Sequence, residues 1–212
     1  MSKSPILYVL AGVNGAGKSS IGGRHLLDVS GVSWFNPDTF AREYREVTGC
    51  SQQEANAVAW NEGMRYLDEA IANGTSYAFE TTLGGRTVPA KIAAAAVTHD
   101  VVIWYCGLAS PELHIARVEA RVAAGGHDIP EGKIHERYQS SLLNLIALLP
   151  RLMSLTVYDN SAQVVPGEPI PDPVLVLDMY QGKIHFPDTV ASIMATPDWA
   201  KPLVEVALSE RE

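Results

Sequence analysis

The stretch "ILYVLAGVNGAGKSS" (residues 6–20) decides the fold of this chain, because an apolar run leads directly into a glycine-rich loop. Within it, "GVNGAGKS" (12–19) satisfies the pattern G-x-x-x-x-G-K-[ST]. Such a segment forms a buried strand, a loop whose N–H groups converge on a phosphate, and the positive end of a helix. The pattern predicts a nucleotide-binding loop, or P-loop, made by Gly12, Asn14, Gly15, Ala16, Gly17, Lys18, Ser19 and Ser20.

Two side chains of this loop have specific expected roles. Lys18 is expected to reach the β- and γ-phosphates of ATP, and Ser19 to offer its hydroxyl to Mg²⁺. The alternative is a glycine-rich turn that binds nothing, but such a turn does not need a lysine at this position. ATP and Mg²⁺ are therefore the expected ligands.

Further along the chain, short apolar runs alternate with amphipathic stretches, which is typical of a parallel sheet covered by helices. Strands are expected at 6–12, 32–35, 76–80, 101–107 and 155–160, and helices near 18–28, 37–48, 51–73, 87–98, 110–124 and 131–149. The tail adds an extended connector (164–173), a hairpin turning at Gln181-Gly182, and a helix near 197–209. We expect an α/β P-loop NTPase sandwich with a mainly parallel five-stranded sheet, a helical lid, and a C-terminal β-hairpin and short helix.

The composition limits the possible partners. The 212 residues fit one domain (1–212), with a core at 5–161 and an extension at 164–212. The net charge of −8 disfavours general affinity for nucleic acid or anionic lipid. Two cysteines, no targeting segment and no apolar run of membrane-spanning length favour a cytoplasmic location.

The motifs also separate classes of P-loop protein. A guanine-reading N-K-x-D is missing, and the third expected strand ends in Glu80, where motor and regulatory ATPases usually carry an aspartate. Small-molecule kinases remain, and their signature is an arginine-rich lid that excludes water and neutralises the charge of the transferring phosphoryl group.

Carboxylates follow two of the expected strands. Asp38 comes just after the second strand, where it can take the proton of an attacking hydroxyl; the alternative is that it merely caps the helix that follows. Glu80 is expected to orient the acceptor or a Mg²⁺-bound water. Thr81 and Thr82 are expected to bind the acceptor, and Arg86 to hold an anionic part of it.

The presumed lid follows these residues. Arg117 and Arg121 share one helical face that runs into a hinge at Gly125-Gly126, although a solvated face is the plainer interpretation. Beyond the hinge, Lys133, Arg137, Ser140 and Asn144 form a polar seam along the helix at 131–149, opposite an apolar stripe. This is the pattern that a closing lid would carry.

The strings "LAGVNGAGKSS", "FNPDTFA", "FETTLGGR", "GGHDIPEGKIHERYQSSLLNL" and "YDNS", in this order, resemble the zeta toxin family of P-loop kinases over roughly residues 5–161. The resemblance implies an ATP- and Mg²⁺-dependent kinase that phosphorylates the 3′-hydroxyl of the amino sugar in UDP-N-acetylglucosamine, and a small antitoxin protein as a possible partner. Asp38 matches the catalytic base, Glu80 and Thr82 match substrate-binding positions, and Arg117 and Arg137 match phosphate-clamping arginines. The residues alone also fit a kinase with another acceptor, or a nucleotide-binding regulator with little turnover.

Overall fold

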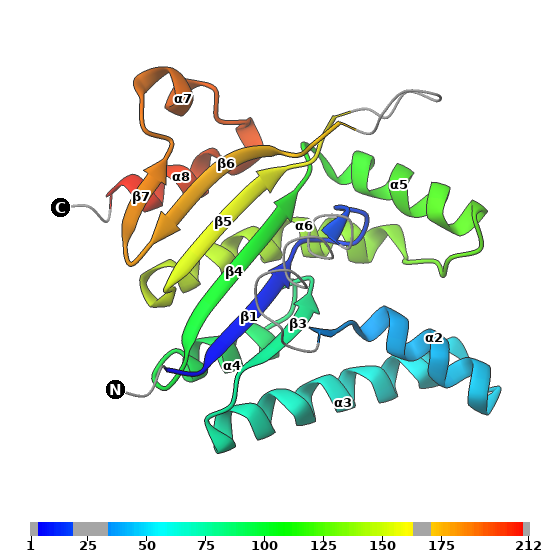
Figure 1. Ribbon diagram of the computed structural model, residues 1–212. Coiled ribbons are helices and arrows are strands. Elements are labelled where there is room, and N and C mark those ends of the chain that lie inside the picture. Colours follow the sequence, from blue (N-terminus) through cyan, green and yellow to red (C-terminus); the bar gives the residue numbers. More distant parts are fainter. Residues whose placement is uncertain (1–3, 19–33, 163–170, 210–212) are drawn as a thin grey trace.

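The computed structural model describes residues 4–18, 34–162 and 171–209. Within these residues, the strands form one sheet in the order β2-β3-β1-β4-β5-β6-β7 (Figure 1). The strands are β1 (Ile6–Ala11), β2 (Trp34–Phe35), β3 (Tyr77–Thr81), β4 (Asp100–Gly107), β5 (Ser154–Asp159), β6 (Val174–Tyr180) and β7 (Lys183–Phe186). The first five run parallel, as the alternation of strands and helices predicts.

The expected helices are present with ends close to the predicted ones. They are α2 (Pro37–Thr48), α3 (Gln52–Asn73), α4 (Thr87–Ala95), α5 (Pro111–Ala123), α6 (Glu131–Leu148) and α8 (Lys201–Ser209), with the short helices η1 (Leu149–Arg151), α7 (Val190–Met194) and η2 (Asp198–Ala200). The helix expected near 18–28 lies, beyond Lys18, outside the described residues, as does most of the connector at 164–173.

The expectation of a five-stranded sheet was wrong, because the C-terminal hairpin continues the sheet. Strand β6 pairs antiparallel with β5, and β7 pairs with β6, which gives seven strands. The hairpin turns at Gln181 and Gly182, as predicted, and both have positive φ (50° and 71°), as the tightest hairpin turns require.

Helix α2 shows how local sequence sets the ends of an element beside the site. The side chain of Asn36 caps its first turn by accepting hydrogen bonds from the N–H groups of Asp38 and Thr39. Pro37 follows at a position where its missing N–H is not needed, and Gly49 ends the helix with φ of 70°. These caps place Asp38 at the start of α2, next to the sheet.

The main core lies between one face of the sheet and helices α4, α6 and α8, which lie behind the sheet in Figure 1. Leu7, Ile103 and Leu155 point from the strands towards Leu145 of α6 and Leu203 of α8, and all five are fully buried. Each such side chain contributes about 1.5–3 kcal/mol by leaving water. Helix α6 is thereby fixed to the sheet along its apolar stripe.

The strand register brings the functional segments to one edge of the sheet. Ala11 at the end of β1 pairs with Thr81 of β3 and with Tyr105 of β4. The N–H of Gly12 then donates to the carbonyl oxygen of Thr81 (3.2 Å), so the P-loop begins directly beside the end of β3. No helix in the described part of the chain is both long and apolar enough to span a bilayer.

Candidate active site

A cleft of about 440 Å³ opens where the parallel strands β1, β2 and β3 end. Its walls come from the P-loop, the starts of α2 and α4, the middle of α3, the loop after β3, and the start of α6 with the segment before it. Binding crevices of open parallel sheets lie at this edge. The predicted residues Asn14, Lys18, Asp38, Glu80, Thr81, Thr82, Arg86 and Arg137 all line this one cleft.

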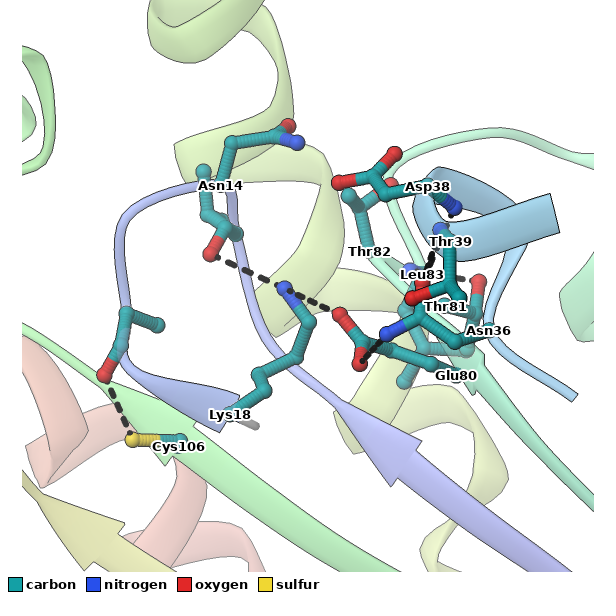
Figure 2. Close-up of polar contacts among 12 residues, drawn as sticks. Asn14, Lys18, Asn36, Asp38, Thr39, Glu80, Thr81, Thr82, Leu83 and Cys106 are labelled. Carbon is teal, nitrogen blue, oxygen red and sulfur yellow. Dashed lines mark hydrogen bonds and ion pairs between the residues drawn. The ribbon is translucent and has the colours of Figure 1, made fainter. Parts of the chain in front are cut away.

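The P-loop has the strained backbone that its glycines allow. Gly12, Gly15 and Gly17 have φ of 141°, 83° and 85°, which other residues rarely adopt. Lys18 follows at the start of a helix and is 7% exposed. Its ammonium group lies 3.3 Å from the carbonyl oxygen of Val13 and 3.3 Å from Oε1 of Glu80 (Figure 2).

Glu80 is held from two sides at the end of β3. Besides the ion pair with Lys18, its Oε2 accepts a hydrogen bond from Nδ2 of Asn36 (3.0 Å; Figure 2). The same Asn36 side chain caps α2 through its oxygen, so it joins the segment that carries Asp38 to the carboxylate of Glu80. Sequence reasoning missed Asn36, although an asparagine just before a proline at a helix start is a typical N-cap.

Asp38 is not the capping residue of α2, because Asn36 fills that role. Its carboxylate is about half exposed and lies between two groups from the α5–α6 region. Nη1 of Arg121 is 3.8 Å from Oδ2, and Nε2 of His127 is 3.8 Å from Oδ1. Arg121 is steadied by a hydrogen bond from Nη2 to the carbonyl oxygen of His127 (3.1 Å). Asp38 thus presents a carboxylate to the cleft with the guanidinium of Arg121 and the imidazole of His127 beside it.

The loop after β3 forms the wall of the cleft opposite α3. Oγ1 of Thr81 accepts a hydrogen bond from the N–H of Leu83 (3.1 Å), and Oγ1 of Thr82 accepts one from Gly84 (3.4 Å). Both hydroxyls therefore shape the loop and still retain their own protons as donors. Arg86 comes next and is exposed; its carbonyl oxygen accepts from the N–H of Ala90 (3.2 Å), but its guanidinium makes no hydrogen bond or ion pair within the described ranges.

An apolar side of the cleft faces this loop. It is formed by Phe35, Met64 and Val88, together with Trp60, whose side chain remains 50% exposed. Gly63 belongs to the same wall, and a Cβ there would meet the ring of Phe35 at 2.8 Å. The lining of the cleft thus includes a half-exposed aromatic ring, Trp60, and the exposed guanidinium of Arg86.

The polar seam predicted along α6 has two different uses. Nη1 of Arg137 donates to Oδ1 of Asn14 in the P-loop (2.7 Å), so this arginine reaches the nucleotide side of the cleft. Ser140 and Asn144, one and two turns further on, instead donate to backbone carbonyl oxygens of the loop at 83–85. The seam thereby anchors the rest of α6 to that loop. The first two turns of α6 line the cleft, and His127, in the segment before the helix, lies beside Asp38.

Arg117, which matches a phosphate-clamping arginine, lies beside the P-loop. It does not line the cleft but lies against Gly17, and its Nη2 donates to the carbonyl oxygens of Asn160 (2.7 Å) and Ala162 (3.1 Å). The predicted nucleotide ligands Ser19 and Ser20 fall outside the described residues.

Comparisons with known proteins agree with this geometry. A family model described as zeta toxin matches residues 1–165. The structure resembles a chain of the AvrRxo1-ORF1 and ORF2 crystal structure with ATP, at 14% identity and a TM-score of 0.65, over 96% of this chain and 64% of that chain. It also resembles a chain of the PezAT toxin–antitoxin system of Streptococcus pneumoniae, at 18% identity and a TM-score of 0.53, over 74% of this chain and 68% of that one. No curated protein sequence matches significantly. At these identities the structural likeness concerns the P-loop kinase fold.

Proposed function

The chain belongs to the zeta toxin family, and from that premise we propose that it is an ATP-dependent kinase acting on a hydroxyl group of a small molecule. One observation carries the proposal: the P-loop lysine and a half-exposed carboxylate, Asp38, open onto the same cleft. Phosphoryl transfer needs a group that holds the γ-phosphate and one that accepts the proton of the attacking hydroxyl. A regulator that only bound ATP would need the first group and not the second.

Each residue has a defined task in this proposal. Lys18 binds the β- and γ-phosphates of ATP, and Arg137 adds charge from α6 next to Asn14. Asp38 accepts the proton from the acceptor hydroxyl as its oxygen bonds to the γ-phosphorus and the bond from that phosphorus to the β–γ bridging oxygen breaks, which releases ADP. Arg121 lies near enough to Asp38 to reach a phosphate oxygen brought beside it.

Glu80 suits a role in holding Mg²⁺ through water. Hard cations prefer oxygen ligands, and this carboxylate is the acidic group paired with Lys18. The hydroxyl of Ser19 is the expected direct ligand from the P-loop motif. When bound, the ion neutralises charge on the phosphates.

We propose UDP-N-acetylglucosamine, through the 3′-hydroxyl of its amino sugar, as the acceptor. The family supports this choice, and so does the chemistry of the side chains that line the cleft. Trp60 and Met64 offer an apolar surface for a flat ring, and Arg86 offers a charge for a diphosphate. Glu80, Thr81 and Thr82 line the same cleft as Lys18, and sugar hydroxyls would bind to them. We also propose a cytoplasmic location and an antitoxin protein as a partner, in keeping with the PezAT system.

The decisive experiment follows release of ADP from ATP and Mg²⁺, with and without UDP-N-acetylglucosamine, and identifies the product by mass spectrometry. Asp38→Asn should lower kcat by about 100-fold or more, the usual contribution of a positioned general base. Glu43→Gln, an exposed carboxylate of the same helix that does not line the cleft, is the matched control. If ADP release does not depend on the sugar nucleotide, the acceptor is a different molecule. Equal turnover by Asp38→Asn would remove Asp38 as the base.

A further inference from the structure

Each glycine of the P-loop faces a residue from a distant part of the chain, so closely that a Cβ would not fit. The built Cβ atom would lie 2.2, 2.7 and 2.4 Å from the nearest atom of that residue. The pairs are Gly12 with the carbonyl oxygen of Cys106, Gly15 with the carbonyl oxygen of His114, and Gly17 with Nδ2 of Asn160. None of these three partners belongs to the nucleotide-binding motif itself.

The same three partners donate hydrogen bonds to the carbonyl oxygens of the P-loop. Nδ1 of His114, on α5, donates to the carbonyl oxygen of Asn14 (2.8 Å). The thiol of Cys106, near the end of β4, and Nδ2 of Asn160, just after β5, both donate to the carbonyl oxygen of Ala16, each at 2.9 Å. Figure 2 shows the Cys106 contact. Side chains from β4, from α5 and from the segment after β5 thus hold the P-loop through its carbonyl oxygens.

Burial keeps two of these groups in their donating form. Burial lowers the pKa of His114 to about 4. The hydrogen bond between its ring and the backbone of Asn14 acts in the opposite direction and raises this pKa, but by less. The ring is therefore neutral near pH 7, and because a carbonyl oxygen only accepts, Nδ1 must carry the proton. Burial likewise raises the pKa of the Cys106 thiol to about 12, so this group remains a donor.

Fixing a carbonyl also fixes the N–H of the next residue. In a trans peptide the C=O and N–H bonds of one plane point in opposite directions. The carbonyl of Asn14 shares its plane with the N–H of Gly15, and that of Ala16 shares its plane with the N–H of Gly17. Within residues 4–18, 34–162 and 171–209, neither N–H has a hydrogen-bond partner. Both therefore point away from the three donors and are available to an anion.

We propose that His114, Cys106 and Asn160 are positioning residues that aim the N–H groups of Gly15 and Gly17 at the phosphates of the bound nucleotide. The inference rests on the proposed function only in that the P-loop binds a nucleotide, not on the acceptor. It assigns a role to residues that do not line the cleft and that the motif does not contain. The glycines and these donors form one unit, since each glycine lacks a side chain where its donor residue packs.

The test is the affinity for ADP and ATP, measured by titration calorimetry on the full chain. His114→Leu removes the donor at similar volume, whereas His114→Asn places an amide N–H close to the position of Nδ1. We expect about 3- to 10-fold weaker binding for His114→Leu, the loss of one neutral hydrogen bond, and recovery in His114→Asn. Asn160→Asp should weaken binding further, because it also adds negative charge beside Gly17. His135→Asn, on an exposed histidine outside the cleft, is the control.

Kinetics and thermal melting complete the experiment. Variants that keep the wild-type melting temperature should raise KM for ATP and leave kcat at saturating ATP nearly unchanged. Equal losses in His114→Leu and His114→Asn would attribute the effect to packing and overturn the inference. Wild-type affinity for the nucleotide in both His114→Leu and Asn160→Asp would also overturn the inference, and it would leave the proposed kinase function intact. If the wild-type chain bound no nucleotide, both proposals would fail together.

Discussion

The ion pair between Lys18 and Glu80 links the P-loop to the acceptor side of the cleft, and it is largely out of water. The two side chains are 7% and 11% exposed, with 3.3 Å between Nζ and Oε1. Among the described residues, Lys18 otherwise contacts only the carbonyl oxygen of Val13, and Glu80 contacts Nδ2 of Asn36. Removing one member therefore leaves the other as a buried charge with one neutral partner.

The magnitude follows from this geometry. Breaking a buried pair by removing one partner costs about 3–5 kcal/mol, whereas removing both charges costs much less. Because both groups keep a hydrogen bond and some exposure, we expect about 3 kcal/mol for each of Glu80→Gln and Lys18→Met. Because it leaves no unpaired buried charge, the double variant should be more stable than either single one, which gives a coupling of more than about 3 kcal/mol.

The assay is a double-mutant cycle in urea at pH 7, supported by thermal melting. For a chain of this size, 3 kcal/mol corresponds to a fall in Tm of about 6–12 °C. The exposed pair of Arg65 with Glu62 on α3 provides the matched control, because water and salt screen it, and its cycle should show little coupling. If the losses for Lys18→Met and Glu80→Gln add within about 0.5 kcal/mol, the two charges do not stabilise each other and the reasoning fails.

Three further predictions concern the groups around the cleft. Burial lowers the pKa of His114 from 6.5 to about 4. Between these two pH values the imidazole of His114 is therefore protonated in the unfolded chain but not in the folded chain. The free energy of unfolding should therefore fall by up to about 3 kcal/mol between pH 6.5 and 4, and His114→Asn should remove this component in urea titrations. Asn36→Asp keeps the cap of α2 but cannot donate to Glu80 unless protonated; it should lower kcat/KM by about 10-fold, and an unchanged kcat/KM would show that this bond is dispensable. Arg137→Ala should mainly lower kcat, because charge beside the P-loop matters most as the phosphoryl group transfers; a change confined to KM for ATP would make Arg137 a binding residue only.

Local sequence predicted strand β1, the loop that follows it to Lys18, and most helix ends in the described residues. The prediction of α2 at 37–48 holds to the residue because its end signals, Asn36, Pro37 and Gly49, act on neighbouring backbone groups. Lys18 and Glu80 were each predicted to lie in the site, and they meet there because the ends of parallel strands share one edge of the sheet; the ion pair itself was not predicted.

Periodicity could not tell which acceptor a polar side chain would find. Arg137, Ser140 and Asn144 share one seam of α6, yet the first bonds to the P-loop and the other two to backbone carbonyls of the loop after β3. The acceptors of Arg117, which are the carbonyl oxygens of Asn160 and Ala162, could not be predicted from periodicity either. All of these acceptors lie more than 40 residues away along the chain. Every residue has a backbone carbonyl, so the sequence does not show which carbonyl needs a side-chain donor.

The pairing of the C-terminal hairpin with β5 was equally hidden, and it changes how the site is supported. The family match ends at residue 165, but Nε1 of Trp199 donates to Oδ1 of Asp159 (3.1 Å), and its ring covers Gly107 at the end of β4. Asp159 immediately precedes Asn160, which holds the carbonyl of Ala16 in the P-loop. The segment after the family match therefore packs against the strand ends that carry Cys106 and Asn160. If the positioning role proposed above holds, residues 171–209 support the P-loop through these contacts, although none of them lines the cleft.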